Sequence, residues 1–266
     1  MGEMGITPIR LEPDKYISFF SSYKKSLPLL VTDYDGTLTP FVKEREKASL
    51  SPKTKSLLKS ICEAGGDVII VSGRKPEEIN DFVGLPLEIW GCHGMEKIDR
   101  KGRSTRGYIP EEELKKLDDF SSQLNYFPRG SVEKKPSGIA LHWRDRADIF
   151  DMYMEVSDKL LSEASANSLK VMSFNGGVEF ILPYFTKGTA IIDISIIYQK
   201  ASPLCYLGDD TTDEDAFKEV KKIKSGVGIL VSDDEKESAA DVYISRSEVD
   251  LFLDFWLNEL TPKGRC

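Results

Sequence analysis

The segment that decides the fold is residues 29–40, which read LLVTDYDGTLTP. An apolar strand ends at Thr32, and two carboxylates, Asp33 and Asp35, follow just past its end. Gly36 comes next and permits a sharp reversal of the chain that a side chain would obstruct. Two acids at the carboxyl end of a buried strand indicate a functional site. The alternative is an Asx turn with one solvated aspartate.

Other apolar segments resemble this strand, and helical patterns lie between several of them. The predicted strands are residues 27–32, 67–71, 88–90, 204–207 and 226–231. Each is short and ends at Gly, Ser or Asp, as strands that are buried on both faces do. The predicted helices include residues 52–62, with Ser51 at the N-cap, and residues 209–221 and 248–260. This alternation predicts an α/β fold with a parallel sheet, helices on both faces and ligands at the carboxyl ends of the strands.

The middle of the chain has a different pattern. A helix predicted over 110–124 precedes the β-rich segment 131–143, and a second helix predicted over 146–164 precedes strands at 169–174 and 178–182. The Asn-Gly-Gly sequence at 175–177 indicates a hairpin between those strands. We therefore predict an antiparallel α+β domain over residues 108–184, inserted into a core formed by residues 1–107 and 185–266.

Three more motifs occur at the ends of predicted strands or the start of a helix. Residues 69–74 read IIVSGR and present a hydroxyl, a glycine N–H and a cation, which are groups that bind phosphoryl oxygens. Lys187-Gly188 precedes a helix predicted over 189–198. Residues 206–217 read YLGDDTTDEDAF, and their closely spaced acids would repel one another unless a hard cation such as Mg²⁺ or a helix N-terminus compensated. Taken singly, these motifs are also compatible with a helix N-cap, a solvated lysine and an acidic helix start.

In this order, the four motifs resemble the haloacid-dehalogenase (HAD) superfamily of phosphoryl-transfer enzymes. The resemblance implies a Rossmann-like core, with the predicted insert in the position of a C2-type cap. Residues 33–40, 92–96 and 208–217 resemble the trehalose-6-phosphate phosphatase family, as do 133–135, 139–144 and 178–180 in the insert. Trp143 stands where that family usually has tyrosine, and Pro136 lies where an acidic residue or glycine is common.

The resemblance implies roles for residues of the core. Asp33 would be the nucleophile and Asp35 the acid and base, with Ser72 and Lys187 completing the catalytic set. The implied cofactor is Mg²⁺, bound by a carboxylate oxygen of Asp33, the backbone carbonyl of Asp35 and Asp209. The other implied residues bind phosphoryl oxygens or orient a metal-bound water and Lys187; they are Gly36, Gly73, Arg74, Asp210 and Asp213.

The insert would recognise the sugar. The resemblance assigns this role to Glu133, Lys135, Arg144 and Glu179, whose alternative role is an exposed salt-bridge ladder across neighbouring strands. His93 is assigned to substrate positioning, with a structural hydrogen bond in the loop as the alternative. His142 is not needed by this chemistry.

Composition excludes several classes of partner. Lys and Arg number 36 against 44 Asp and Glu, a net charge of −8, so we expect no nucleic-acid partner. We also expect no membrane partner, because no apolar run approaches the length of a span. The four cysteines form no C-x-x-C pair, which argues against zinc. No signal peptide is evident, and a cytoplasmic location is expected. The oligomeric state is left open.

The sequence therefore predicts a Mg²⁺-dependent phosphatase that converts trehalose 6-phosphate to trehalose and phosphate. Two alternatives stay open. The substrate could be another sugar phosphate, such as sucrose phosphate or mannosyl-3-phosphoglycerate, because the core chemistry would be the same. The protein could also be a non-catalytic sugar-phosphate sensor, although the presence of Asp33 argues against it.

Overall fold

A nine-stranded sheet forms the centre of the larger lobe in the computed structural model, which describes residues 7–23, 26–40, 48–144 and 146–261. The strands lie in the order β1-β13-β12-β11-β2-β3-β4-β5-β6. Their bounds are β1 (Ile9–Arg10), β2 (Leu29–Thr32), β3 (Asp67–Val71), β4 (Glu88–Gly91), β5 (Glu96–Ile98), β6 (Ser104–Arg106), β11 (Leu204–Gly208), β12 (Gly226–Val231) and β13 (Val242–Ile244). All neighbouring pairs from β1 to β4 are parallel, which confirms the predicted parallel sheet.

Four strands of this sheet were missed by the sequence analysis, namely β1, β5, β6 and β13. Each has only two or three residues, too few to show a period of two. The last two strands of the sheet, β5 and β6, run antiparallel to their neighbours. The sheet is thus mostly, not wholly, parallel.

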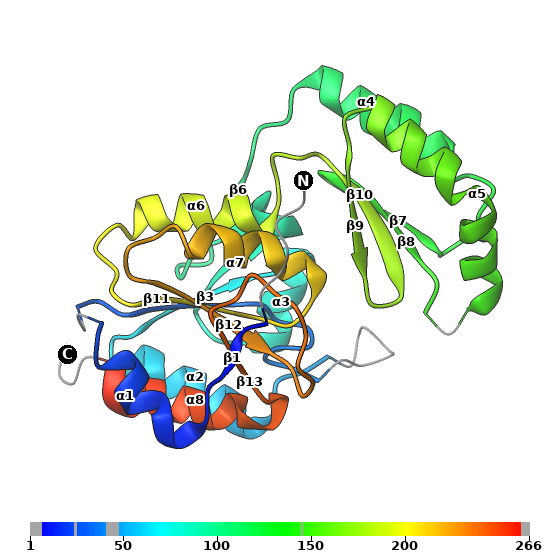
Figure 1. Cartoon of the computed structure of the whole chain (residues 1–266). Helices are drawn as coiled ribbons and strands as arrows, with labels where there is room; N and C mark the ends of the chain where they lie inside the picture. The colour runs from blue at the N-terminus through cyan, green and yellow to red at the C-terminus, as the bar shows by residue number, and fades with distance from the viewer. Residues whose placement is uncertain (1–6, 24–25, 41–47, 145, 262–266) are drawn as a thin grey trace.

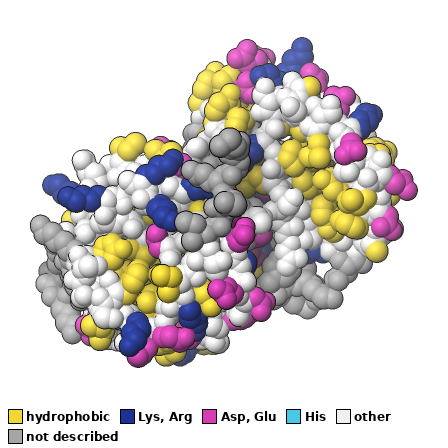
Figure 2. All heavy atoms as spheres, viewed as in Figure 1, with side chains coloured by type: hydrophobic (Ala, Val, Ile, Leu, Met, Phe, Trp, Pro, Cys, Tyr) yellow, Lys and Arg dark blue, Asp and Glu magenta, His cyan; other side chains and the backbone are white. Residues whose placement is uncertain are grey.

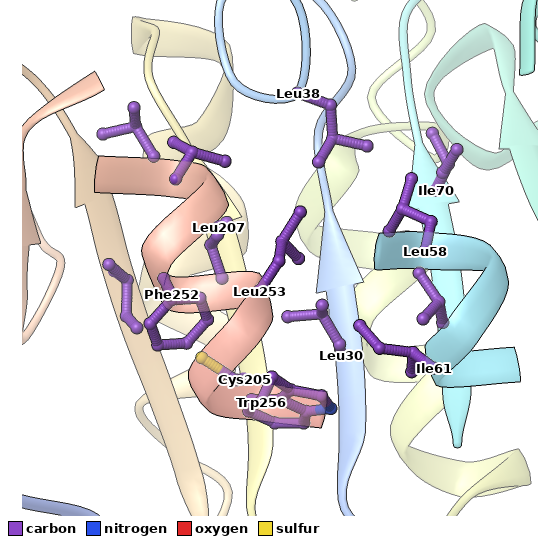
Figure 3. Packing of buried hydrophobic residues seen from close by; sticks show 14 of the residues in the cluster. Leu30, Leu38, Leu58, Ile61, Ile70, Cys205, Leu207, Phe252, Leu253 and Trp256 are labelled. Atoms are coloured by element: carbon purple, nitrogen blue, oxygen red, sulfur yellow. The ribbon is translucent and has the colours of Figure 1, made fainter. Parts of the chain in front are cut away.

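Helices cover both faces of this sheet, as predicted (Figure 1). The helices are α1 (Tyr16–Phe20), α2 (Pro52–Glu63), α3 (Pro76–Val83) and α8 (Val249–Phe255) on one face, with α6 (Lys187–Ile197) and α7 (Glu214–Val220) on the other. Short helical turns complete the lobe: η1 (Pro13–Lys15), η3 (Cys92–Gly94), η4 (Thr211–Asp213), η5 (Arg246–Glu248) and η6 (Trp256–Leu260). Figure 3 shows Leu30 of β2 between side chains of α2 and α8. Its neighbours Leu29 and Val31 pack with α6 and α7, so β2 is apolar on both faces.

A smaller lobe stands beside the first (Figure 1). It consists of α4 (Glu111–Ser122), β7 (Val132–Lys135), β8 (Gly138–His142), α5 (Ala147–Ala166), β9 (Lys170–Phe174) and β10 (Gly177–Ile181). The strands form an antiparallel sheet in the order β7-β8-β10-β9, and a buried cluster that includes Phe120 and Phe180 joins the sheet to the helices. We call this lobe the cap and the larger one the core. All cap elements fall within 108–184, while those boundaries themselves stay a prediction.

The hairpin predicted at 175–177 is a turn of Asn175 and Gly176, because Phe174 of β9 pairs with Gly177 of β10. Gly176 has φ +86°, a left-handed conformation that suits glycine.

Figure 2 shows acidic and basic side chains scattered over both lobes in this view. Among the described residues, none of the helices has the length and apolar character needed to span a membrane. The location in the cell stays a prediction.

Candidate active site

The predicted site residues gather where β2, β3 and β11 end. The register pairs Thr32 with Leu207 and with Ile70, so the residues after these three strands meet at one edge of the sheet. A cavity of about 840 Å³ opens there, lined by residues of both core and cap. Its wall includes the predicted residues Asp33, Asp35, Ser72, Gly73, Arg74, His93, Glu133, Lys135, Arg144, Glu179, Lys187, Asp209 and Asp210. Gly36 and Asp213 lie behind the lining, each against Asp209.

At the floor of the cavity, Lys187 joins two buried carboxylates. Its Nζ lies 2.9 Å from Asp33 Oδ1 and 2.7 Å from Asp213 Oδ1, and all three side chains are at most 5% exposed. Lys187 is the first residue of α6, whose preceding Thr186 caps the helix with its hydroxyl. Burial alone lowers the pKa of Lys187, but the charges of Asp213 and Asp33 outweigh it and hold the pKa above its ordinary value.

Asp213 is held by four donors. Its Oδ1 accepts from Lys187 and from the Tyr206 hydroxyl, and its Oδ2 accepts from the backbone N–H groups of Asp209 and Asp210, both at 3.0 Å. The side chain is fully buried. These bonds make Asp213 a brace that orients Lys187 and shapes the acidic loop after β11.

Asp33 and Asp209 are carboxylates whose charge is poorly compensated by the protein. Burial, followed by the nearby Asp213, Asp209 and Asp35, raises the pKa of Asp33 well above its ordinary range, although Lys187 opposes the shift. Burial and the charge of Asp213 raise the pKa of Asp209 to about 6. A cation bound between two such carboxylates would stabilise their charged forms, so the pair is a candidate metal site.

The donor set fits a small divalent metal ion. Asp33, Asp209 and Asp213 each have an oxygen within 4.8 Å of the others. Because Asp213 is already engaged by four donors, Asp33 and Asp209 are the carboxylates with coordinating capacity left. Gly36 leaves room beside them: a Cβ there would lie 2.1 Å from Asp209 Oδ2. Hard oxygen donors in this number match the preference of Mg²⁺.

The Ser72-Gly73-Arg74 segment leaves β3 beside these carboxylates. Ser72 is buried, and a Cβ on Gly73 would lie 2.8 Å from the His93 ring, so only glycine fits between them. Arg74 was predicted to bind substrate. In the structure its guanidinium forms two bonds of 2.6 Å to the carboxylate oxygens of Asp35 and also pairs with Glu78. Arg74 therefore holds Asp35 in place while lining the cavity.

The cap contributes a buried ion cluster opposite the floor. Glu179 Oε1 lies 2.9 Å from Lys135 Nζ, and its Oε2 lies 3.1 Å from Nε2 of His93, which belongs to the core. Burial alone raises the pKa of Glu179, but Lys135 and His93 outweigh it and hold the pKa well below the ordinary range. The alternative of an exposed ladder is wrong for Lys135 and Glu179, because their side chains are 7% and 5% exposed. Glu133 pairs with His142 at 3.0 Å.

Sequence reasoning missed several residues of the cavity wall: Gly130, His142, Phe174, Asn175, Thr212, Lys236 and Arg246. Two of these contact a proposed metal ligand. Lys236 Nζ donates to the Asp209 carbonyl at 2.6 Å, and Arg246 Nη2 lies 3.4 Å from Asp209 Oδ2. Lys236 lies in the stretch of mixed charges after β12, and Arg246 follows β13 at the start of η5. Nothing in the pattern distinguishes either residue from a solvated cation.

The core and the inserted cap together have the fold of the haloacid-dehalogenase-like (HAD-like) class. The chain resembles solved structures of that fold, among them the C-terminal domain of the Candida albicans trehalose-6-phosphate phosphatase, with a TM-score of 0.77, 20% identity, and coverage of 95% of this chain and 98% of the other. The Aspergillus fumigatus trehalose-6-phosphate phosphatase gives a TM-score of 0.68 at 23% identity, covering 94% and 99%. A HAD-like hydrolase from Bacteroides thetaiotaomicron gives 0.59 at 15% identity, covering 86% and 99%.

The sequence comparisons are more specific. The profile of the trehalose-phosphatase family matches residues 31–248. The "Probable trehalose-phosphate phosphatase D" of Arabidopsis thaliana is 27% identical, over 95% of this chain and 77% of the relative. The trehalose-phosphate phosphatase of Mycobacterium bovis is 30% identical, over 81% of this chain and 57% of the relative, so the chain spans only part of the length of these relatives. This chain belongs to the trehalose-phosphatase family.

Proposed function

We propose that the protein hydrolyses trehalose 6-phosphate to trehalose and phosphate, with Mg²⁺ as cofactor and an aspartyl-phosphate intermediate on Asp33. The observation that carries this proposal is the placement of Asp33. It lies buried beside Lys187 and Asp209 at the floor of a cavity whose wall also includes Lys135 and Glu179 of the cap. Membership of the trehalose-phosphatase family supports the choice of substrate.

Asp33, Asp209 and the backbone carbonyl of Asp35 would hold the metal. The raised pKa values of Asp33 and Asp209 support this assignment, because a cation would offset both the burial and the repulsion between carboxylates that raise them. Mg²⁺ bound there would lower the charge barrier between an anionic nucleophile and an anionic phosphoryl group. Thr37 and Arg246 both contact the Asp209 carboxylate and would fix its orientation.

In the first step, a carboxylate oxygen of Asp33 attacks phosphorus, and the bond from phosphorus to the sugar oxygen breaks. Lys187 neutralises charge on Asp33 and on the phosphoryl group, and Ser72 with the Gly73 N–H binds phosphoryl oxygens. Asp35 gives its proton to the leaving sugar oxygen. Since both Asp35 oxygens accept from Arg74 in the structure, this transfer requires Asp35 to release at least one of those bonds.

In the second step, water attacks the phosphorus of the aspartyl-phosphate. Asp35, now deprotonated, takes a proton from that water, and the bond between phosphorus and the Asp33 oxygen breaks. Phosphate leaves and both carboxyl groups return to their initial states. Two moderate barriers thereby replace one displacement by water on a dianionic ester.

The charges of the cavity wall favour a substrate whose only anionic group is its phosphate. Six carboxylates line the cavity together with six cationic side chains: Asp33, Asp35, Glu133, Glu179, Asp209 and Asp210 against Arg74, Lys135, Arg144, Lys187, Lys236 and Arg246. When Asp35 holds the proton that it donates, the buried Asp213 beside Lys187 keeps the two counts equal. Among the described residues, a dianionic phosphate and one divalent cation would then balance, with no cation left for a second acidic group. The observation favours a neutral sugar over mannosyl-3-phosphoglycerate, which carries a carboxylate.

The test is phosphate release from a panel of trehalose 6-phosphate, sucrose phosphate, mannosyl-3-phosphoglycerate and p-nitrophenyl phosphate, each with Mg²⁺ or with EDTA. We expect Mg²⁺-dependent release that prefers trehalose 6-phosphate. Asp33→Asn should abolish it, whereas Asp254→Asn on the exposed side of α8 should retain it. Preference for another sugar phosphate would overturn the substrate assignment, and no release from any compound would favour the sensor.

A further inference from the structure

The outer edge of the cap sheet rests on the acidic loop of the core. Strand β9 is an edge strand, so part of its backbone has no neighbouring strand to bond. The hydroxyl of Thr211, the first residue of η4, donates to the carbonyl of Ser173 in β9 at 2.6 Å. Thr211 directly follows Asp209 and Asp210, so the cap touches the core one residue beyond the proposed metal loop.

An ion pair reinforces this contact. Lys170 at the start of β9 pairs with Asp215 in the first turn of α7, and the two side chains are 35% and 29% exposed. The backbone of Asp215 in turn lies against the start of α6, because a Cβ on Gly188 would lie 2.9 Å from the Asp215 carbonyl oxygen. Gly188 follows Lys187. Strand β9 is therefore braced against the two segments that carry Asp209 and Lys187.

The cap needs such a brace, because its two connections to the core meet at one place. A Cβ on Gly107, in the segment leading into the cap, would lie 2.9 Å from the ring of Phe185, in the segment leading out. Connections that touch behave as a single tether, about which the lobe can rotate. Contacts away from this tether fix its orientation: His93 with Glu179 inside the cavity, and the contacts of β9 outside it.

The two residues after Ser173 face the cavity. Phe174 and Asn175 line the cavity, whereas Thr211, Ser173, Lys170 and Asp215 do not. The brace can therefore persist when substrate is bound, and it sets where the β9–β10 hairpin stands above the floor. A phosphate ester with a small leaving group reaches Asp33 without using the hairpin, but a disaccharide phosphate has to fit beneath it.

We infer that Thr211, Lys170 and Asp215 form a bridge that positions the β9–β10 hairpin and thereby sets the preference for a disaccharide phosphate over small phosphate esters. The inference rests on the proposed function. It makes these three residues positioning residues, which act on specificity through Phe174 and Asn175 and touch neither substrate nor metal.

The experiment compares kcat and KM for trehalose 6-phosphate and for p-nitrophenyl phosphate, at saturating Mg²⁺, in Lys170→Met and Thr211→Val. We expect kcat/KM for trehalose 6-phosphate to fall about fivefold in each variant, as for loss of one hydrogen bond or ion pair, mainly through a higher KM. The value for p-nitrophenyl phosphate should stay within twofold. Lys170→Arg should retain the wild-type ratio of kcat/KM for the two substrates. Lys222→Met should retain it too, because it removes only an exposed ion pair with Glu219 at the other end of α7.

The wild-type protein alone tests the proposed function, while the change of ratio between wild type and variants tests the bridge. An unchanged ratio in both variants would overturn the inference. An equal loss for both substrates would also overturn it, since the contacts would then support the acidic loop and not the cap. Circular dichroism verifies that each variant is folded. If one variant fails to fold, the other alone tests the inference.

Discussion

At the scale of single residues, the site is organised by how each carboxylate is compensated. Asp213 has four donors, Asp35 has the guanidinium of Arg74, and Asp33 has Lys187 on one oxygen. Asp209 has weaker support, from Thr37 at 3.2 Å and Arg246 at 3.4 Å. The carboxylates least satisfied by the protein are thus the two assigned to the metal, and they are the ones with raised pKa values.

The raised pKa of Asp209, about 6, predicts pH-dependent binding of Mg²⁺. Below that pH the carboxyl group holds a proton that the metal must displace, so affinity should be about tenfold weaker at pH 5 than at pH 7.5. This affinity is measured from the rise in denaturation temperature as Mg²⁺ is titrated at each of the two pH values. Asp209→Asn should lose most of the stabilisation and Asp254→Asn should keep it. Equal affinities at the two pH values would contradict the assignment.

At the scale of elements, the sequence was informative where a pattern repeats or a special residue marks an end. Residues 67–71 and 226–231 are strands with the predicted bounds, and α2 begins after Ser51, as predicted from its N-cap. Strands of two or three residues gave no periodic signal. In the site, Asp33, Ser72 and Asp209 could be found because each follows a strand. Lys236 and Arg246 could not, because only the fold of the chain after β12 brings them to Asp209.

The N-cap of α2 predicts a stability effect that is separate from activity. Ser51 Oγ accepts from the backbone N–H of Thr54 at 3.0 Å, so Ser51→Ala leaves a donor of the first turn without its partner. The free energy of unfolding should fall by about 1 kcal/mol. Urea denaturation followed by tryptophan fluorescence checks this, with Ser157→Ala, in the exposed middle of α5, as the control expected to change little. A loss as small as the control's would show that the cap hydrogen bond contributes nothing.

At the scale of the whole molecule, core and cap are joined by polar contacts as well as by the chain. His93 of the core and Glu179 of the cap are both buried, and their contact lies inside the cavity, whereas Thr211 meets Ser173 outside it. A buried carboxylate between a lysine and a histidine is costly to expose or to leave unpaired. The orientation of the cap relative to the core therefore depends on the charges of the buried residues where the two lobes meet.

The lowered pKa of Glu179 predicts how this junction responds to acid. The unfolded chain binds a proton at Glu179 below its ordinary pKa of about 4.5, while the folded protein does not, so stability falls as the pH drops below that value. Glu179→Gln should cost about 3 kcal/mol at pH 7, because Lys135 is left buried without its counter-ion. The difference between the variant and the wild type in free energy of unfolding, measured by urea denaturation at several pH values, should shrink toward pH 3. A difference that is constant with pH would contradict the charge-based explanation.

The strand order also determines when the site can assemble during synthesis. Strand β2, which carries Asp33, lies between β3 and β11, and Leu29 pairs with Leu204. On the ribosome, β2 and β3 emerge early, and the contiguous cap follows before β11 exists. Asp33 therefore stays at the open edge of an incomplete sheet, and the surroundings of this proposed nucleophile are complete only after the entire cap has been made.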